Sequence, residues 1–145
     1  MPGRSSALEV LLIDDDELLC AQLERLLSNA GIGSLSVTSI EAARAAMEAV
    51  YFPLVIIDRQ LGDGDGIDLC REYRAKYAQQ VRILIFSGTA EAERDVNEGI
   101  AAGADAYLSK RCTEAQLLER VQQLLQGVRS TGARTRSRGG EPPET

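Results

Sequence analysis

The stretch LEVLLIDDDELL, from Leu8 to Leu19, places three consecutive aspartates directly after a run of apolar residues. The apolar run is typical of a buried strand, and a carboxylate just beyond it suits the first turn of a helix. Asp16 alone is enough to cap such a helix. Asp14 and Asp15 need another explanation, because neighbouring like charges repel one another.

The same order of a short apolar strand and an amphipathic helix recurs along the rest of the chain. Strands are expected at 8–13, 34–39, 53–57, 81–86 and 104–109. Helices are expected from Glu17 to Ala30, after an N-cap at Ser39, after the loop RQLGDGDG, at about 90–102, and after a capping box of Thr113 and Gln116. Such repeats predict parallel strands with right-handed crossovers. Five units are too few to close an eight-stranded barrel, so we expect an α/β fold: an open, doubly wound, flavodoxin-like sheet of order 2-1-3-4-5.

Composition bounds the class of protein. The chain has 145 residues, of which 44% are apolar and 26% charged, as in an ordinary globular domain. We expect an N-terminal extension over 1–7, one domain over 8–126, and a disordered tail or linker over 127–145. The net charge of −6 argues against nucleic-acid binding by this domain. No apolar run is long enough for a membrane span, and the cysteines show no pairing pattern, so a cytoplasmic location is expected.

Polar residues follow four of the five predicted strands. In an open α/β sheet, ligands bind outside the carboxyl ends of the strands, where the winding direction reverses. Asp14 and Asp15 follow the strand at 8–13, and Asp58 follows the strand at 53–57. Ser87 and Lys110 follow the strands at 81–86 and 104–109. A hard cation such as Mg²⁺ would relieve the repulsion among the carboxylates, and a hydroxyl and a lysine suit an anion. The row predicts a phosphoryl site, with Asp58 as the nucleophilic acceptor.

Several pieces of the chain together resemble a known family. They are IDDD at 13–16, VIID at 55–58, LGDGDGIDL at 61–69, ILIFSG at 83–88 and GADAYLSK at 103–110. In this order they resemble the receiver domain of two-component response regulators, of the chemotaxis-regulator-like kind. The resemblance covers about residues 8–126.

The resemblance implies how a phosphoryl group would arrive. Asp58 would accept it from the phosphohistidine of a sensor histidine kinase or of a histidine phosphotransfer protein. Mg²⁺ would be bound by Asp15, Asp58 and the backbone carbonyl of Gln60, with Asp14 acting mainly through water. The chain would then be a signalling phosphoprotein rather than an enzyme.

The resemblance also implies how the phosphoryl group would be read. Ser87 and Lys110 would hold its oxygens, and Tyr107 would be the aromatic switch residue. The predicted helix at about 90–102 contains Gly99 and has few apolar anchors, so we expect it to shift at low energetic cost. An effector, or a second copy in a phosphorylation-dependent homodimer, would then read the changed face.

Two other functions share parts of this pattern. A haloacid-dehalogenase-like phosphatase also uses an aspartate nucleophile, Mg²⁺, a hydroxyl and a lysine. Its nucleophile follows the first strand and its acidic pair comes last, the reverse of the order here. A degenerate receiver, which binds partners without phosphorylation, usually lacks the acceptor or the acidic pair, and both are present.

Some positions depart from the family or match other motifs. Arg111 stands where a proline, joined to the lysine by a cis bond, is common, and a non-proline cis bond costs about 2.5–4 kcal/mol. Asp63, Asp65 and Glu72 fall at ligand positions of a calcium-binding loop, but Leu61 occupies the first position, so a calcium site is not expected.

Overall fold

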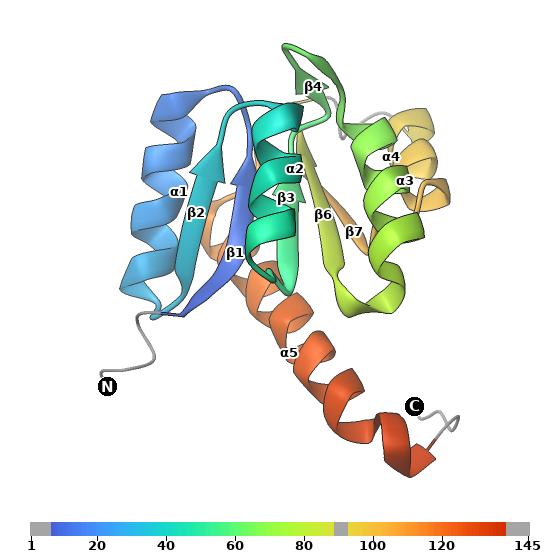
Figure 1. Cartoon of the computed structure of the whole chain (residues 1–145). Coiled ribbons are helices and arrows are strands. Elements are labelled where there is room, and N and C mark those ends of the chain that lie inside the picture. The colour runs from blue at the N-terminus through green and yellow to red at the C-terminus, as the bar shows by residue number, and fades with distance from the viewer. Residues whose placement is uncertain (1–6, 89–92, 139–145) are drawn as a thin grey trace.

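The apolar runs of the sequence form the strands of one central sheet in the computed structural model (Figure 1). The structure describes residues 7–88 and 93–138, with the backbone alone for 128–138. The elements in chain order are β1 (Leu8–Ile13), α1 (Glu17–Asn29), β2 (Gly33–Val37), α2 (Ile40–Ala49), β3 (Leu54–Ile57), β4 (Gln60–Leu61), β5 (Gly64–Asp65), α3 (Gly66–Tyr77), the 3₁₀ helix η2 (Ala78–Gln80), β6 (Arg82–Ser87), α4 (Glu93–Ala101), β7 (Ala106–Ser109) and α5 (Glu114–Arg138).

The sheet has five parallel strands in the order β2-β1-β3-β6-β7. With the short β4 and β5 set aside, this is the order 2-1-3-4-5, so the predicted fold class is confirmed. Leu12 of β1 pairs with Ser36 on one side and Ile56 on the other, which aligns the carboxyl ends of the three strands. Both faces of the inner strands are covered, which explains their nearly unbroken apolar sequence.

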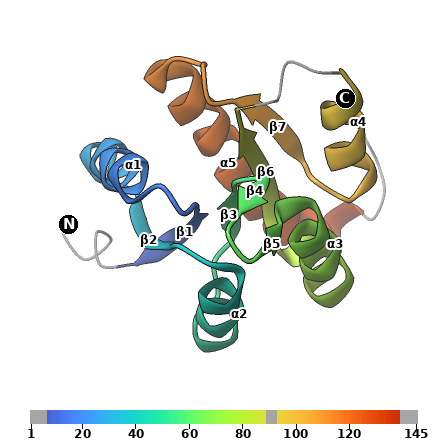
Figure 2. The same cartoon turned by 90° about the horizontal axis from the view of Figure 1, so that it is seen from above.

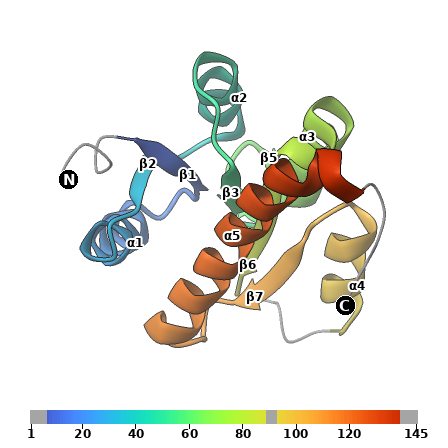
Figure 3. The same ribbon diagram turned by 90° about the horizontal axis from the view of Figure 1, so that it is seen from below.

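Helices cover the sheet in two layers, each with its own core (Figures 2 and 3). Alternate residues of a strand point to opposite faces, so β1 contributes Leu11 and Ile13 to one core, and Val10 and Leu12 to the other. The first core lies against α2 and α3 and includes Ala102, which directly follows α4. The second lies against α1 and α5.

The helices begin where the capping residues of the sequence predict. The Asp16 side chain accepts a hydrogen bond from the backbone N–H of Leu19, at 3.1 Å. Ser39 caps α2 in the same way. Thr113 and Gln116 form the reciprocal capping box of α5, with bonds of 2.9 and 3.0 Å.

Two stretches differ from the sequence prediction. Residues expected to form a loop after Asp58 include a small antiparallel hairpin, in which Gln60 pairs with Asp65 and Leu61 with Gly64. The last helix, expected to end near residue 126, continues to Arg138. A helix closes its backbone hydrogen bonds within itself, and arginines near its C-terminal end are favourable, so it can extend beyond the core. The domain boundary at 126 stays a prediction.

Three further expectations concern chain ends and one helix start. Residues 1–6 of the N-terminal extension, 90–92 of the predicted fourth helix and 139–145 of the tail lie outside the described residues. Within the described ranges, no helix has both the length and the apolar character that crossing a bilayer requires.

Candidate functional site

The carboxyl ends of the strands carry the predicted site residues, and backbone hydrogen bonds fix each of them to the neighbouring strand. The N–H of Asp14 donates to the Val37 carbonyl at 3.1 Å, and the N–H of Asp58 donates to the Ile13 carbonyl at 2.9 Å. The N–H of Lys110 donates to the Ser87 carbonyl at 3.0 Å. These bonds continue the sheet ladders by one step, so the side chains converge at one edge.

Three carboxylates meet at this edge. Asp14, Asp15 and Asp58 each offer an oxygen within 4.8 Å of the others. Asp14 and Asp58 are buried, with exposed fractions of 5% and 6%, whereas Asp15 is exposed. The predicted grouping of these residues is therefore present in the structure.

Lys110 is the counter-ion of the two buried carboxylates. Its Nζ lies 2.8 Å from Asp14 Oδ2 and 3.4 Å from Asp58 Oδ1. The other oxygen of Asp14 accepts the backbone N–H of Asp16 at 2.9 Å, so Asp14 is already well bonded. No peptide bond in the described ranges is cis, so Lys110 holds this position with a trans bond to Arg111.

Burial and neighbouring charges shift the pKa values of Asp58 and Lys110. Burial, reinforced by the negative charge of Asp14, raises the pKa of Asp58 to about 6, although Lys110 and the backbone N–H of Gln60 favour its ionised form. Burial alone would lower the pKa of Lys110, but the hydrogen bond and charge of Asp14 outweigh it and raise that pKa. Keeping the buried Asp58 carboxylate ionised therefore costs free energy, and a second cation beside it would reduce that cost.

The chemistry of this donor set fits a divalent cation. Three carboxylates face a single lysine, so the cluster keeps an excess of negative charge. Hard cations prefer oxygen ligands, and the exposed Asp15 leaves the cluster open to solvent on one side. The acidic trio is therefore consistent with a metal site.

The remaining predicted residues lie around the trio. Ser87 ends β6 and is buried, and Gln60, in β4, is exposed. Tyr107 lies in β7, half-buried against the core beneath α2 and α3. Its hydroxyl is buried near Arg59, without a well-formed hydrogen bond among the described residues.

Gly99 has a role that the sequence prediction missed. Helix propensity indicates only a weak point at this position, but Gly99 is the buried residue of α4, and the Tyr107 ring packs against it. A Cβ at position 99 would lie 2.4 Å from Cδ2 of Tyr107, closer than a real contact allows. Only glycine lets the ring occupy this inward position.

We expect Gly99→Ala to push the Tyr107 ring outward. Overpacking should lower the free energy of unfolding by about 1–3 kcal/mol, despite the better helix propensity of alanine. Near-ultraviolet circular dichroism would report the ring and urea unfolding the stability. Gly88→Ala is the matched control, because a Cβ there meets no atom of the described residues within 4 Å. Equal effects of the two variants would contradict the packing role of Gly99.

The acidic residues at calcium-loop positions have structural partners instead. Asp63 accepts backbone N–H groups of Ile40 and Glu41 at the start of α2, at 3.0–3.3 Å. Asp65 caps α3, and Glu72 pairs with Arg44 at 2.8 Å. These contacts give each of the three carboxylates a structural role.

Two neighbours of Asp58 were not predicted from the sequence. Gly66 allows the chain to pass so close that a Cβ there would lie 2.2 Å from the Asp58 carbonyl oxygen. Arg59 forms ion pairs with residues of β5 and α4. Arg59 directly follows the expected acceptor, but its partners in α4, Asp95 and Glu98, are 36 and 39 residues away in the sequence.

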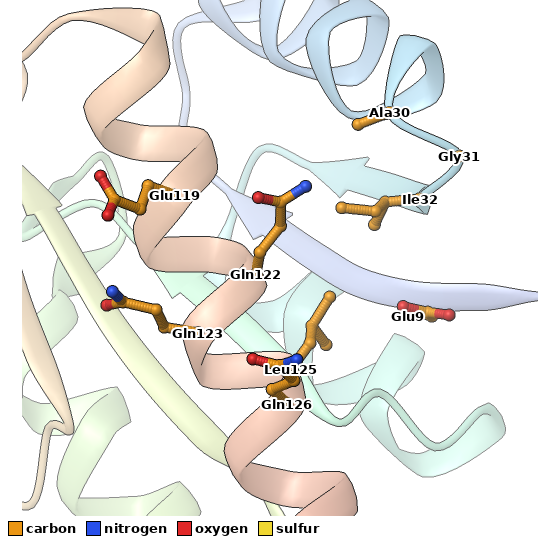
Figure 4. A pocket seen from close by; sticks show the side chains of 9 residues that line it. All are labelled: Glu9, Ala30, Gly31, Ile32, Glu119, Gln122, Gln123, Leu125 and Gln126. Atoms are coloured by element: carbon orange, nitrogen blue, oxygen red, sulfur yellow. The ribbon is translucent and has the colours of Figure 1, made fainter.

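A separate hollow of about 520 Å³ lies near the amino ends of β1 and β2, against α5 (Figure 4). Its lining includes Glu9, Glu119 and Gln122. None of the predicted site residues lines it, so the acidic edge of the sheet remains the candidate functional site.

An open parallel sheet of this order, with an acidic trio and a lysine at its carboxyl edge, defines a phosphoacceptor signalling domain. The model of the response regulator receiver domain matches residues 10–122, and the chain belongs to that family. As a receiver domain it is a phosphoacceptor in two-component signalling rather than an enzyme, which sets the phosphatase alternative aside.

Similar proteins agree with this assignment. The transcriptional regulatory protein GltR of Pseudomonas aeruginosa is 36% identical over 91% of this chain and 53% of its own length. The chain thus spans about half the length of the curated relatives it matches. A CheY-like receiver domain from Methanospirillum hungatei has a TM-score of 0.78 at 24% identity, covering 86% of this chain and 98% of its own. The beryllofluoride-activated receiver domain of Klebsiella pneumoniae RstA has a TM-score of 0.75 at 21% identity, covering 81% and 97%.

Proposed function

We propose that Asp58 is the phosphoryl acceptor and that its donor is the phosphohistidine of a sensor histidine kinase or a histidine phosphotransfer protein. The observation that carries this proposal is the convergence of Asp14, Asp15 and Asp58 within 4.8 Å, beside Lys110. Asp58 stands on the middle strand of that group, between the acidic pair of β1 and Ser87 of β6.

Mg²⁺ is the cation that best fits the proposed reaction. Asp15, Asp58 and the Gln60 carbonyl would bind it, and Asp14 would act mainly through water. When bound, the ion supplies positive charge to the oxygens of the transferring phosphoryl group. The raised pKa of Asp58 supports this assignment, because burial beside Asp14 disfavours a bare carboxylate.

The side chains of the chain itself would carry out the transfer. An Asp58 carboxylate oxygen forms the new O–P bond as the N–P bond to the donor histidine breaks, and the bonding pair returns to the imidazole. Lys110 would move from Asp14 to a phosphoryl oxygen, and Ser87 would donate a hydrogen bond to another. Asp14 would keep its bond to the Asp16 N–H throughout.

The output would follow from the new charge at Asp58. Phosphorylation replaces the single negative charge of the Asp58 carboxylate by the roughly two charges of an acyl phosphate, and its new acceptor oxygens draw Ser87 inward. Tyr107 would then turn toward the space that Ser87 leaves, and an effector or a second copy would read the altered face. We place this signalling in the cytoplasm, with no nucleic-acid or membrane binding by this domain.

Intact-mass measurement with acetyl phosphate tests the acceptor. With Mg²⁺, the wild type should gain one phosphoryl group, and EDTA should prevent it. Asp58→Asn should gain none, while Asp68→Asn, which removes an exposed carboxylate of α3, should behave like the wild type. Equal uptake by Asp58→Asn would place the acceptor elsewhere.

A further inference from the structure

Charge, more than apolar packing, holds helix α4 to the rest of the domain. Over Glu93–Ala101 its buried residue is Gly99, and the side chain of Ile100 is 49% exposed. Arginines from other elements hold the helix and its C-terminal end instead. Arg59 contacts α4 itself, and Arg74 contacts the turn that follows it.

Arg59 binds α4 through two carboxylates on one face of the helix. Its Nη1 lies 3.0 Å from Asp95 Oδ1, and its Nη2 lies 2.6 Å from Glu98 Oε1. A third carboxylate, that of Asp65 in β5, lies 3.6 Å from its Nε. The side chains of Arg59 and Asp95 are only 18% and 24% exposed, so water weakens this pair less than it weakens ordinary surface pairs.

The backbone links this ionic cluster directly to the proposed acceptor. Arg59 is the residue after Asp58, and its carbonyl accepts the N–H of Gly66 at 2.6 Å. The chain passes Gly66 with no space for a Cβ. A change in the charge or position of Asp58 therefore acts directly on Arg59, because no flexible segment separates the two residues.

The C-terminal end of α4 has a separate and firmer attachment. Arg74 of α3 donates to the Gly103 carbonyl from Nε at 3.0 Å and from Nη2 at 2.8 Å. Its Nη2 also lies 2.7 Å from Asp105 Oδ2, and that oxygen accepts the Ile83 N–H of β6 at 2.8 Å. The C-terminal end of α4 is thus bonded to the sheet and to α3, whereas the part of α4 that contacts Arg59 is held by side-chain ion pairs.

Space for movement lies beside Arg59. A hollow of about 460 Å³ is lined by Arg59, Gln60, Leu61, Gly64, Asp65 and Asp95. The guanidinium can therefore leave its carboxylates without displacing a packed side chain.

We propose that Arg59 is an ionic latch that holds α4 in its unphosphorylated position, with the Arg74–Gly103 attachment as the pivot. This inference rests on the proposed acceptor role of Asp58. The three carboxylates that contact Arg59 carry more negative charge than its single guanidinium can neutralise. The added negative charge of a phosphoryl group on the preceding residue repels Asp95 and Glu98, which opens the latch.

Amide hydrogen exchange with beryllofluoride and Mg²⁺ as the phosphoryl mimic tests the latch. Without the mimic, Arg59→Gln should speed exchange of the α4 amides about fivefold over the wild type, as expected for a coupling of about 1 kcal/mol. The mimic should also bind about fivefold more tightly, because the competing latched state is weakened. Glu98→Gln should reproduce both effects, and the double variant should add little to either single one.

Arg44→Gln is the matched control, since Arg44 also forms a two-bond pair, with Glu72, away from α4. It should change neither the exchange of α4 nor the affinity for the mimic. Unchanged α4 exchange in both Arg59→Gln and Glu98→Gln, or weaker binding of the mimic, would overturn the latch. A wild type that does not bind the mimic would overturn the proposed acceptor role, and the latch function with it.

Discussion

Replacing Asp15 with alanine is expected to slow Mg²⁺-dependent phosphorylation by about 100-fold or more, while the domain stays folded. Asp15 is the exposed member of the acidic trio, so removing it leaves the core intact and relieves repulsion of Asp14 and Asp58. What is lost is a proposed metal ligand. Intact-mass time courses with acetyl phosphate, over a series of Mg²⁺ concentrations, would measure the loss.

The neighbouring carboxylate supplies the control for this experiment. Asp16→Ser removes a charge one residue away but keeps a side chain that can cap α1. It should be phosphorylated at nearly the wild-type rate. If Asp15→Ala matched it, or if Asp15→Ala unfolded, Asp15 would not be a metal ligand of the kind proposed.

The second large effect concerns stability rather than phosphorylation. In EDTA at pH 8, Asp58→Asn should be more stable than the wild type by on the order of 3 kcal/mol. Burial raises the pKa of Asp58 from 3.8 to about 6, so the folded protein binds this proton more tightly than the unfolded chain. Ionising Asp58 therefore lowers the free energy of unfolding, and asparagine avoids that loss.

The sign of the pH dependence follows from the same pKa. The cost of Asp58 is absent below about pH 4, grows as the pH rises toward 6, and is complete above it. The advantage of Asp58→Asn in urea unfolding should thus disappear on acidification. An advantage that instead grew toward pH 4 would show that burial does not govern this carboxyl. Added Mg²⁺ should favour the wild type and narrow the gap at pH 8.

Local sequence patterns were enough to predict most of the fold. The apolar runs place the five main strands to within a few residues, and they are most nearly unbroken in the three inner strands, which are buried on both faces. Asp16 and Ser39 mark helix starts because a cap acts on a backbone N–H only a few residues away. The convergence of the trio and Lys110 followed from topology, because parallel strands bring their carboxyl ends to one edge.

What the sequence did not predict depends on distant partners. Arg59 and Glu98 are 39 residues apart, and no local pattern joins them. Gly99 looked like a defect of its helix, because the ring that needs its missing side chain belongs to β7. Asp63 accepts backbone N–H groups at the start of α2, an element more than twenty residues before it, and no local pattern indicates this bond.

The division of the interior into two cores has a consequence for how this protein can vary. Tyr107 and the end of α4 belong to the core shared with α2 and α3, while α1 and α5 pack on the other side of the sheet. If α4 and Tyr107 move as proposed, the sheet separates them from the layer of α1 and α5, which would stay in place. Substitutions of Leu23, Leu27 or Val121, which lie in the core beneath α1 and α5, would then change the free energy of unfolding more than the signalling output. Stability and signalling output could therefore change independently, because the residues that govern them lie on opposite faces of the sheet.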